Sequence, residues 1–502
     1  MFPIRRMLCR RLRHLSTTIP RSTTPTLILG IETSCDDTGV AIVDSTGHIV
    51  FEALSSQDTT HLPYGGIVPK LAKRDHEINL PRLLDQAETA IGSFDHLDGI
   101  AATAGPGLAL CLRVGYRAGR ELAHHRNLPF VAVNHLEAHV LVPRLEHTLE
   151  FPFLALLVSG GHCMLLLTRG VNDHVRLGTT HDDSLGEAYD KVARMLDLDM
   201  KGGGGAALER LALEGDEDSI PFPTPLRRRK DCMFSFSGLK TAVYLACQKL
   251  SAKGGVGGEG EGEGEGEGRS SDRANVEKKL QLNQEQMEEN LNRLQVWKEK
   301  KNSGPKKLQK KEALAFWKKI NDEYKSYKLQ KKYLLDKNKK YHQQMEEITA
   351  RQVGMNRQDR ANVAASFQKA ARLHLQQRLK YALEWCDEQV DQGTLACAPT
   401  SVVVTGGVAS NQYLRDHLSA VVDERNESNA TCSTEICFPP LRLCTDNGVM
   451  VAWTGHERMA VGLLDDATPP LDGMEDFKTR WPLGGDRVKN KKGRVLLDQP
   501  VL

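Results

Sequence analysis

The sequence lacks the features that mark membrane proteins and disulfide-stabilised proteins. No apolar run among its 502 residues approaches the ~18 residues that a membrane-spanning helix needs. Its 11 cysteines are scattered and form no Cys-x-x-Cys pair, which argues against a disulfide framework or a structural zinc ribbon and fits a reducing compartment. The length instead predicts two or more domains with substantial hydrophobic cores.

The chain also lacks a large net charge, but its charges are unevenly distributed. The net charge is +2, yet residues 269–351 contain 22 Lys and Arg against 12 Asp and Glu, and residues 1–25 contain six Arg and no acid. The remaining residues are therefore acidic overall. Any nucleic-acid surface on them must be a local patch.

Two segments of biased composition lie outside the part of the chain that we expect to fold into compact domains. Residues 1–25 are rich in Arg, Ser and Thr and lack the apolar centre of a secretory signal, which favours a mitochondrial transit peptide over a disordered basic tail. Residues 252–358 contain five Glu-Gly repeats and then a Lys-rich stretch, typical of a flexible linker followed by a long basic helix or hairpin that is partly disordered. The pentapeptide Asp-Arg-Ala-Asn-Val at 272–276 recurs at 359–363. The block is therefore either a true insertion or a retained intron.

A strand–turn–strand pattern occurs twice in the remaining chain. An apolar strand enters a polar turn and a second strand within residues 27–44, and the same outline recurs within residues 153–168. Strands alternating with helices predict an α/β domain, and the repeat predicts a duplicated lobe with a phosphate-binding hairpin in each half. Coincidence between two hairpins is the alternative. We expect these segments: lobe I at 26–150, lobe II at 151–251 and 359–485 with a closing helix, and a tail at 486–502.

A pair of histidines follows the apolar strand at 129–133. His135 and His139 are four residues apart and therefore lie on one face of a helix, where two imidazoles can hold a divalent metal. Two surface histidines are the alternative. Asp446 begins a second helix, where it is a helix N-cap by default, but it is also the best carboxylate to complete a metal site.

Glycine-rich turns predict ligand contacts elsewhere. A four-glycine run at 202–205 opens a helix, and Gly-Gly-Val-Ala-Ser-Asn at 406–411 follows a buried strand. Glycines allow backbone to approach a ligand closely, and helix N-termini attract anions. A basic cluster at 227–230 lies beside the aromatic stretch 234–240, a combination that suits RNA. We interpret Cys35 as a small residue in a tight turn, not as a nucleophile.

Six motifs together point to one family. They are His135-x-x-x-His139, Leu-Val-Ser-Gly-Gly at 157–161, Cys-Thr-Asp-Asn-Gly at 444–448, Gly-Ile-Glu-Thr-Ser-Cys-Asp-Asp-Thr at 30–38, Phe-Ser-Phe-Ser-Gly-Leu-Lys at 234–240 and the 406–411 turn. Over about 27–250 and 359–483 the chain resembles the TsaD-type tRNA N6-adenosine threonylcarbamoyltransferases, also described as O-sialoglycoprotein endopeptidase-like. The leader and the Cys-Asp-Asp-Thr turn fit the mitochondrial branch.

The resemblance implies a fold and an activity. The fold is the two-lobed actin-like ATPase, sugar-kinase and heat-shock chaperone architecture with duplicated RNase H-like lobes. The activity is transfer of a threonylcarbamoyl group from threonylcarbamoyl-AMP to N6 of the adenosine 3′ of the anticodon, position 37, in mitochondrial tRNAs that read codons starting with A. It further implies a homodimer in the mitochondrial matrix.

The resemblance also implies site residues. One divalent ion per subunit, zinc or iron, would be held by His135, His139 and Asp446. No catalytic residue beyond this metal site is assigned. Substrate contacts would come from Leu157, Val158, Ser159, Gly160, Gly161, Asp190, Gly205, Glu209, Ser410, Asn411 and Thr445.

Two other functions stay open. One is a metal-dependent glycoprotein endopeptidase, although Leu136 stands where the zinc proteases have their general-base Glu, and Glu137 is one position too late. The other is an actin-like ATPase without tRNA activity.

Overall fold

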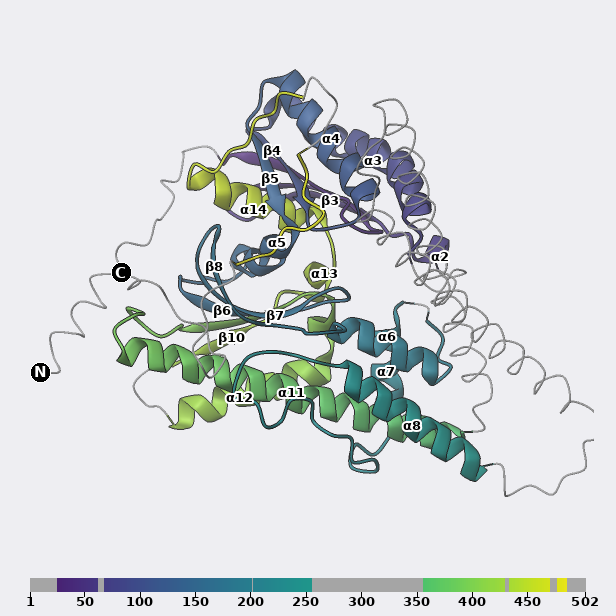
Figure 1. The fold of residues 1–502 in the computed structure, drawn as a ribbon. Coiled ribbons are helices and arrows are strands. Elements are labelled where there is room, and N and C mark those ends of the chain that lie inside the picture. The colour runs from purple at the N-terminus through teal and green to yellow at the C-terminus, as the bar shows by residue number, and fades with distance from the viewer. Residues whose placement is uncertain are drawn as a thin grey trace, which may run out of the picture. The chain divides into compact units, whose positions relative to one another are not determined.

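Two five-stranded mixed sheets form the framework of the fold (Figure 1). The first has the order β3-β2-β1-β4-β5. Strands β1 and β2, and β2 and β3, pair antiparallel, whereas β1, β4 and β5 run parallel. Its strands are β1 (Leu27–Glu32), β2 (Thr38–Asp44), β3 (Ile49–Ser55), β4 (Gly99–Gly105) and β5 (Phe130–Asn134).

The second sheet repeats this topology. Its order is β10-β9-β6-β7-β8, with β6, β7 and β8 antiparallel and β6, β9 and β10 parallel. In each sheet an antiparallel three-stranded meander is thus extended on one side by two parallel strands. This confirms the predicted duplicated α/β fold. The strands are β6 (Phe153–Val158), β7 (Cys163–Gly170), β8 (Asp173–Thr179), β9 (Ser401–Thr405) and β10 (Glu435–Cys437).

The helices complete the described chain. The computed structural model describes residues 25–61, 67–200, 202–254, 355–428, 433–469 and 476–484. The longer helices are α3 (Pro69–Ile91), α4 (Ala109–Arg126), α6 (Leu185–Met195), α7 (Gly204–Ala212), α8 (Ser237–Gly254), α11 (Arg357–Asp391), α12 (Gln412–Ser428) and α14 (Gly448–Ala460). The shorter ones are α2 (Asp58–His61), α5 (His135–Leu141), α13 (Leu441–Cys444) and the 3₁₀ turns at Phe94–His96, Val142–Leu145 and Gly407–Ser410. Within the described residues, none of the helices is long and apolar enough to span a bilayer.

Contacts divide the chain into two compact units. One comprises Met1–Ala193, Asp199–Val243 and Ala361–Leu502, and the other Arg194–Leu198 and Tyr244–Arg360. Both sheets lie in the first unit. The predicted leader, the tail at 486–502 and nearly all of the predicted insertion fall outside the described residues, so those boundaries stay predictions.

The first sheet is covered on both faces because its strands alternate side chains between two cores. Leu29 and Ile42 pack in one cluster with residues of α3 and α4. Ile28 and Val43 point the other way, into a cluster with α14. A strand buried on both faces reads as an almost continuous apolar run, which explains why β1 and β2 were predictable from the sequence.

Helix α14 approaches the first sheet unusually closely because glycines face each other. A Cβ added at Gly30 would lie 2.3 Å from the backbone nitrogen of Ala452, and one added at Gly39 would lie 2.7 Å from the nitrogen of Gly448. The absence of side chains here lets the N-terminus of α14 rest on β1 and β2. The segment that precedes α14, although it comes late in the chain, is thereby carried to lobe I.

Helix α5 lies between the two sheets (Figure 1). Its Ala138 belongs to the core of the first sheet. Its Leu136 and Val140 belong to a core with Leu157 and Val403 of the second sheet. The Thr405 hydroxyl, at the end of β9, donates a hydrogen bond of 2.8 Å to the backbone oxygen of His139. The histidine-bearing helix is therefore held from both sides.

Several elements differ from the sequence-based expectation. Strands β3, β8 and β10 and helix α12 were not predicted. Strand β3 is half-exposed and β8 contains charged residues, so neither shows the apolar run of a central strand. Helix α11 is 35 residues long and runs from Arg357 to Asp391. Residues 363–368 of this helix are all buried, so this part of it shows no single apolar face from which its length could be read.

Candidate metal centre and ligand loops

The first two candidate ligands are positioned by the cap of α5. The Asn134 side chain accepts hydrogen bonds from the backbone nitrogens of Leu136 (2.9 Å) and Glu137 (3.3 Å). This satisfies otherwise unpaired amides at the helix start and makes His135 the first helical residue. All seven residues of α5 are buried, so both imidazoles are enclosed in the protein and not on its surface.

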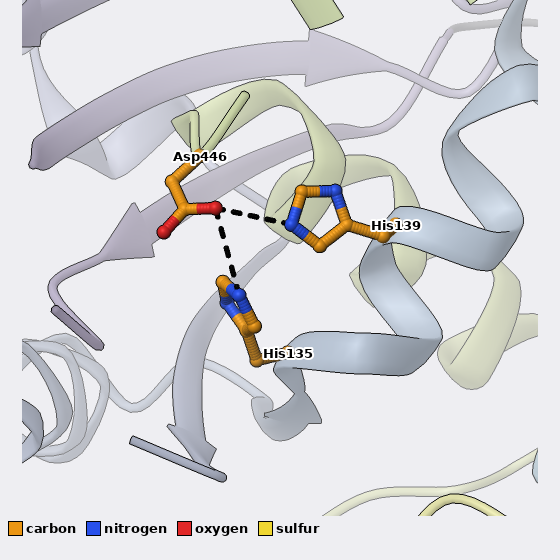
Figure 2. A group of neighbouring side chains, drawn as sticks. All are labelled: His135, His139 and Asp446. Atoms are coloured by element: carbon orange, nitrogen blue, oxygen red, sulfur yellow. Dashed lines mark hydrogen bonds and ion pairs between the residues drawn. The ribbon is translucent and has the colours of Figure 1, made fainter. Parts of the chain in front are cut away.

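The third candidate ligand comes from the segment before α14. The expected N-cap role of Asp446 is wrong, because the Asn447 side chain caps α14 by accepting from the backbone nitrogen of Met450 at 2.8 Å. The Asp446 carboxylate is thereby left to face α5. Its Oδ1 lies 3.0 Å from Nε2 of His139 and 3.6 Å from Nε2 of His135 (Figure 2).

The charges of this group favour a cation among them. Burial alone would raise the pKa of Asp446, but the two histidines outweigh it and hold that pKa well below its ordinary value. Burial alone would lower the pKa of His135, but Asp446 and Glu32 outweigh it and raise that pKa to about 9. The two carboxylates therefore favour a positive charge at this site.

The same atoms fit a divalent ion. Their ligand atoms all lie within 4.8 Å of one another, and two imidazole nitrogens with one carboxylate oxygen are donors that zinc and iron accept. Three protein ligands leave coordination positions open, as catalytic sites do. Nδ1 of His139 is buried without a hydrogen-bond partner among the described residues.

The predicted substrate residues gather at one edge of the second sheet. Parallel strands β6 and β9 end side by side, with Leu157 opposite Thr405, so the turns that follow them leave the sheet together. A Cβ added at Gly406 would lie 2.4 Å from the backbone oxygen of Val158. Leu157 and Val158 are buried within the sheet, where Leu157 is paired with both Met164 and Thr405, so ligand contacts through these two residues stay a prediction. At Gly160 and Gly161, an added Cβ would meet nothing within 4 Å.

Helices α6 and α7 adjoin the same edge. A Cβ added at Gly186, in the first turn of α6, would lie 2.7 Å from Cα of Gly160. Asp190 of α6 lies against the start of α7, since a Cβ added at Gly204 would come within 2.6 Å of its Oδ1. Gly205 follows in the first turn of α7. The structure thus brings Asp190 and Gly205 to the edge that carries the 157–161 turn.

Three of the remaining predicted contacts lie at the start of α12, whereas Thr445 lies between α13 and α14. Glu209 accepts a hydrogen bond of 2.7 Å from the backbone nitrogen of Gln412. Asn411 is buried, and its side chain accepts from the Leu414 nitrogen (2.9 Å) and donates to the oxygen of Gln368 (3.2 Å). Asn411 thus caps α12, which the sequence did not reveal. Ser410 and Thr445 are exposed.

Comparison with known proteins identifies the family. A sequence model described as TsaD: tRNA N6-adenosine threonylcarbamoyltransferase matches residues 48–453. The chain belongs to this family. It is an enzyme, a transferase that modifies the N6 atom of adenosine in tRNA.

Relatives from a plant and a bacterium are similarly close. The probable mitochondrial tRNA N6-adenosine threonylcarbamoyltransferase of Arabidopsis thaliana is 36% identical over 93% of this chain and 76% of its own length. The tRNA N6-adenosine threonylcarbamoyltransferase of Sphingopyxis alaskensis is 35% identical over 91% of this chain and 96% of its own length. Among solved structures, component A of the (R)-2-hydroxyglutaryl-CoA dehydratase of Acidaminococcus fermentans is 11% identical and covers 87% of this chain and 99% of that chain, with a TM-score of 0.36.

Glu137 of this transferase has a structural environment that sets it apart from a protease base. It is fully buried and accepts from Arg458 of α14 at 2.8 Å and from Asn172 of the β7–β8 turn at 2.5 Å. Nε2 of His174 on β8 lies 3.0 Å away. The carboxylate therefore joins three elements and has no open side from which to activate water.

Two further predictions concern residues outside the metal group. Burial raises the pKa of the Cys35 thiol far above its ordinary value, which disfavours the thiolate that a nucleophile requires. In the basic cluster at 227–230, Arg229 pairs with Asp231 at 2.6 Å. Nearby Lys240 pairs with Asp183 at 2.9 Å. These two cations are thus partly neutralised, and an RNA-binding role for the cluster stays a prediction.

Glu32 is the site residue that the sequence analysis did not single out. Its side chain is fully buried, and its Oε2 lies 3.1 Å from Nδ1 of His135. A charged residue at the end of an otherwise apolar strand was the available signal, since buried acids occur almost only with partners.

Proposed function

We propose that this transferase takes the threonylcarbamoyl group from threonylcarbamoyl-AMP and attaches it to adenosine 37 of mitochondrial tRNAs that read codons starting with A. The transferase family supports the reaction. The basic, acid-free leader and the relative named as mitochondrial support the compartment, which we propose to be the matrix. A homodimer is part of the same proposal.

The metal centre would be formed by His135, His139 and Asp446, with one ion, zinc or iron, per subunit. A bound divalent ion would draw charge from phosphate or carbamoyl oxygens and so favour departure of AMP. The observation that carries this proposal is the convergence of Nε2 of both histidines on Oδ1 of Asp446. His139 and Asp446 are 307 residues apart in the sequence.

The donor substrate would bind at the edge of the second sheet. The open space at Gly160 and Gly161 allows the backbone of this turn to approach phosphate oxygens. The nucleoside would lie against the neighbouring turn and helices. The contacts proposed are Leu157, Val158, Ser159, Gly160, Gly161, Asp190, Gly205, Glu209, Ser410, Asn411 and Thr445.

The chemistry requires positioning more than covalent catalysis. The carbamoyl–phosphate anhydride is already activated, so no enzyme-bound intermediate is needed, and the protein must hold a weakly nucleophilic amine in line with it. A base in the anticodon loop is unpaired and can turn outward at modest cost. The buried, ion-paired state of Glu137 gives no support to the endopeptidase alternative.

The test supplies purified protein with threonylcarbamoyl-AMP and mitochondrial tRNA and measures modified adenosine by mass spectrometry of nucleosides. The unaltered protein should form product on tRNAs for codons starting with A, and His139→Ala should form at least 100-fold less. ATP hydrolysis without modified tRNA would instead support the ATPase alternative. Equal product from the variant would refute the metal role.

A further inference from the structure

The strongest unexplained feature of the site is the set of hydrogen bonds around Glu32. This carboxylate ends β1 and is fully buried. Its Oε1 accepts from the backbone nitrogen of Ser34 at 2.5 Å. Its Oε2 accepts from the hydroxyl of Thr103 at 2.6 Å and lies 3.1 Å from Nδ1 of His135. Both oxygens are thus engaged, and one faces a candidate metal ligand.

The two histidines differ in the contacts of Nδ1, the ring nitrogen that does not face Asp446. Behind His135, Nδ1 faces Glu32, whereas Nδ1 of His139 has no hydrogen-bond partner among the residues that the structure describes. The Ser34 hydroxyl, 3.2 Å from Nδ1 of His135, can donate or accept and so does not decide the proton's place. An ionised carboxylate only accepts, so Glu32 requires a proton on that nitrogen.

We propose that Glu32 is a positioning residue that keeps a proton on Nδ1 of His135 and so presents Nε2, the atom facing Asp446, to a divalent cation. The inference rests on the metal site proposed above. Hydrogen bonds from a ligating histidine to a carboxylate set its ring orientation and raise its basicity, and their loss typically weakens metal binding by about 10- to 100-fold. Glu32 would contact neither the cation nor the substrate.

The geometry makes Glu32→Gln a sharp test because an amide has one acceptor end and one donor end. The donor at Ser34 is a backbone N–H, which cannot be reversed, so the amide oxygen of Gln must take the place of Oε1. The amide NH₂ then faces Thr103 and His135. The Thr103 hydroxyl can turn to accept, but Nδ1 of His135 can accept only without its proton, and the ring's proton then sits on Nε2. Metal ligation through Nε2 would force two donors to face each other.

The experiment measures zinc affinity of the metal-free full-length protein by competition with a chromophoric chelator. Glu32→Gln should bind zinc at least 10-fold more weakly than the unaltered protein. The matched control is Thr103→Val, which removes one bond to Glu32 but leaves the contact with His135, and it should stay within about threefold. The d–d absorption of bound cobalt, which reports ligand geometry, should change in Glu32→Gln and stay the same in Thr103→Val.

The outcomes separate failure of this inference from failure of the proposed function. If the unaltered protein binds no zinc or cobalt, the metal site itself is wrong. If it binds and Glu32→Gln binds equally well with an unchanged spectrum, Glu32 has no positioning role while the metal site stands. Should Glu32→Gln fail to fold by circular dichroism, Glu32→Asp decides, because its shorter chain withdraws the carboxylate from His135. Unchanged zinc affinity in that variant would overturn the inference.

Discussion

The two halves of the molecule place a hairpin turn at the same point of the same strand order, yet the turns differ in chemistry. In the first half, the turn between β1 and β2 is packed and carries acids. His76 of α3 clamps it, with Nδ1 2.8 Å from the Thr38 hydroxyl and Nε2 3.1 Å from the backbone oxygen of Cys35. In the second half, an added Cβ at Gly160 or Gly161 would meet nothing within 4 Å.

The difference indicates a division of work between the duplicated halves. The first turn supplies Glu32 and Ser34 to His135. It also carries Asp37, whose pKa is raised to about 7 by burial and then by the charge of Asp446. Because this turn already contains several carboxyl groups, it disfavours the binding of a further anion such as a phosphate. The second turn has room and no acid, so we expect the phosphate of the donor to bind there. Five substitutions test this division, in order of decreasing expected effect.

Asp446→Ala should have the largest effect, because it alters the proposed metal centre and leaves the turn of the second half unchanged. Removing the carboxylate takes away one of three candidate ligands, so bound metal and tRNA modification should fall by at least 100-fold. Metal content by atomic emission and product by nucleoside mass spectrometry measure both. Because the substitution also leaves two buried histidines without their carboxylate partner, the variant should lose some stability, and circular dichroism must show that it is folded. Full metal content in the variant would contradict the assignment.

Glu137→Gln should weaken the connection between the halves. Glu137 links α5 to Arg458 of α14 and to His174 of β8, and breaking a buried ion pair costs about 3–5 kcal/mol. Urea denaturation at pH 7 should show a loss of this order.

The same variant has a defined pH dependence. Burial alone would raise the pKa of Glu137, but the hydrogen bond and charge of His174 and the charge of Arg458 outweigh it and hold the pKa below its ordinary value. A lowered folded pKa stabilises the fold above the unfolded value of about 4.3 and loses that contribution as pH falls through the folded pKa. The difference in unfolding free energy between the variant and the unaltered protein should therefore become smaller at acidic pH. A difference in unfolding free energy that does not change with pH would contradict the ion-pair interpretation.

Gly160→Ala and Gly39→Ala make the same change in the two halves and should have opposite outcomes. At Gly160 the new methyl group enters open space, so stability should be unchanged while KM for threonylcarbamoyl-AMP rises about tenfold, equivalent to about 1.4 kcal/mol. At Gly39 it would lie 2.7 Å from the nitrogen of Gly448 and should destabilise the fold by about 1–3 kcal/mol. Steady-state kinetics and thermal unfolding distinguish them. An unaffected KM in Gly160→Ala would place the donor elsewhere.

Ser34→Ala should have the smallest effect. It removes the hydroxyl 3.2 Å from Nδ1 of His135 but keeps the backbone nitrogen that binds Glu32. With Glu32 still holding the ring, zinc affinity should fall by only about two- to threefold, near the ~0.5–1.5 kcal/mol of an ordinary hydrogen bond. Chelator competition measures it. A loss as large as that of Glu32→Gln would assign the positioning role to the serine.

Pattern reasoning found the elements whose burial is uniform. Strands β1, β6 and β9 are fully or almost fully buried, so their apolar runs could be recognised as strands in the sequence. Strand β3, half-exposed at the sheet edge, was not. For the site, spacing alone put His135 and His139 on one helix face, but Glu32 was missed because local sequence does not reveal which distant group a buried acid will meet.

The sequence by itself determined the repeated strand–turn–strand outline, the paired histidines and the family, because periodic burial and motif spacing are local properties of the chain. Tertiary structure alone decided that Asn447, not Asp446, caps α14 and that Asp446 therefore faces both histidines. It also decided that Glu32 lies behind one histidine and no comparable carboxylate was found behind the other among the described residues. The physical reason is the close approach of α14 to Gly30 and Gly39 of β1 and β2, which brings Asp446 to His139, 307 residues away in the sequence, and has no counterpart in local sequence.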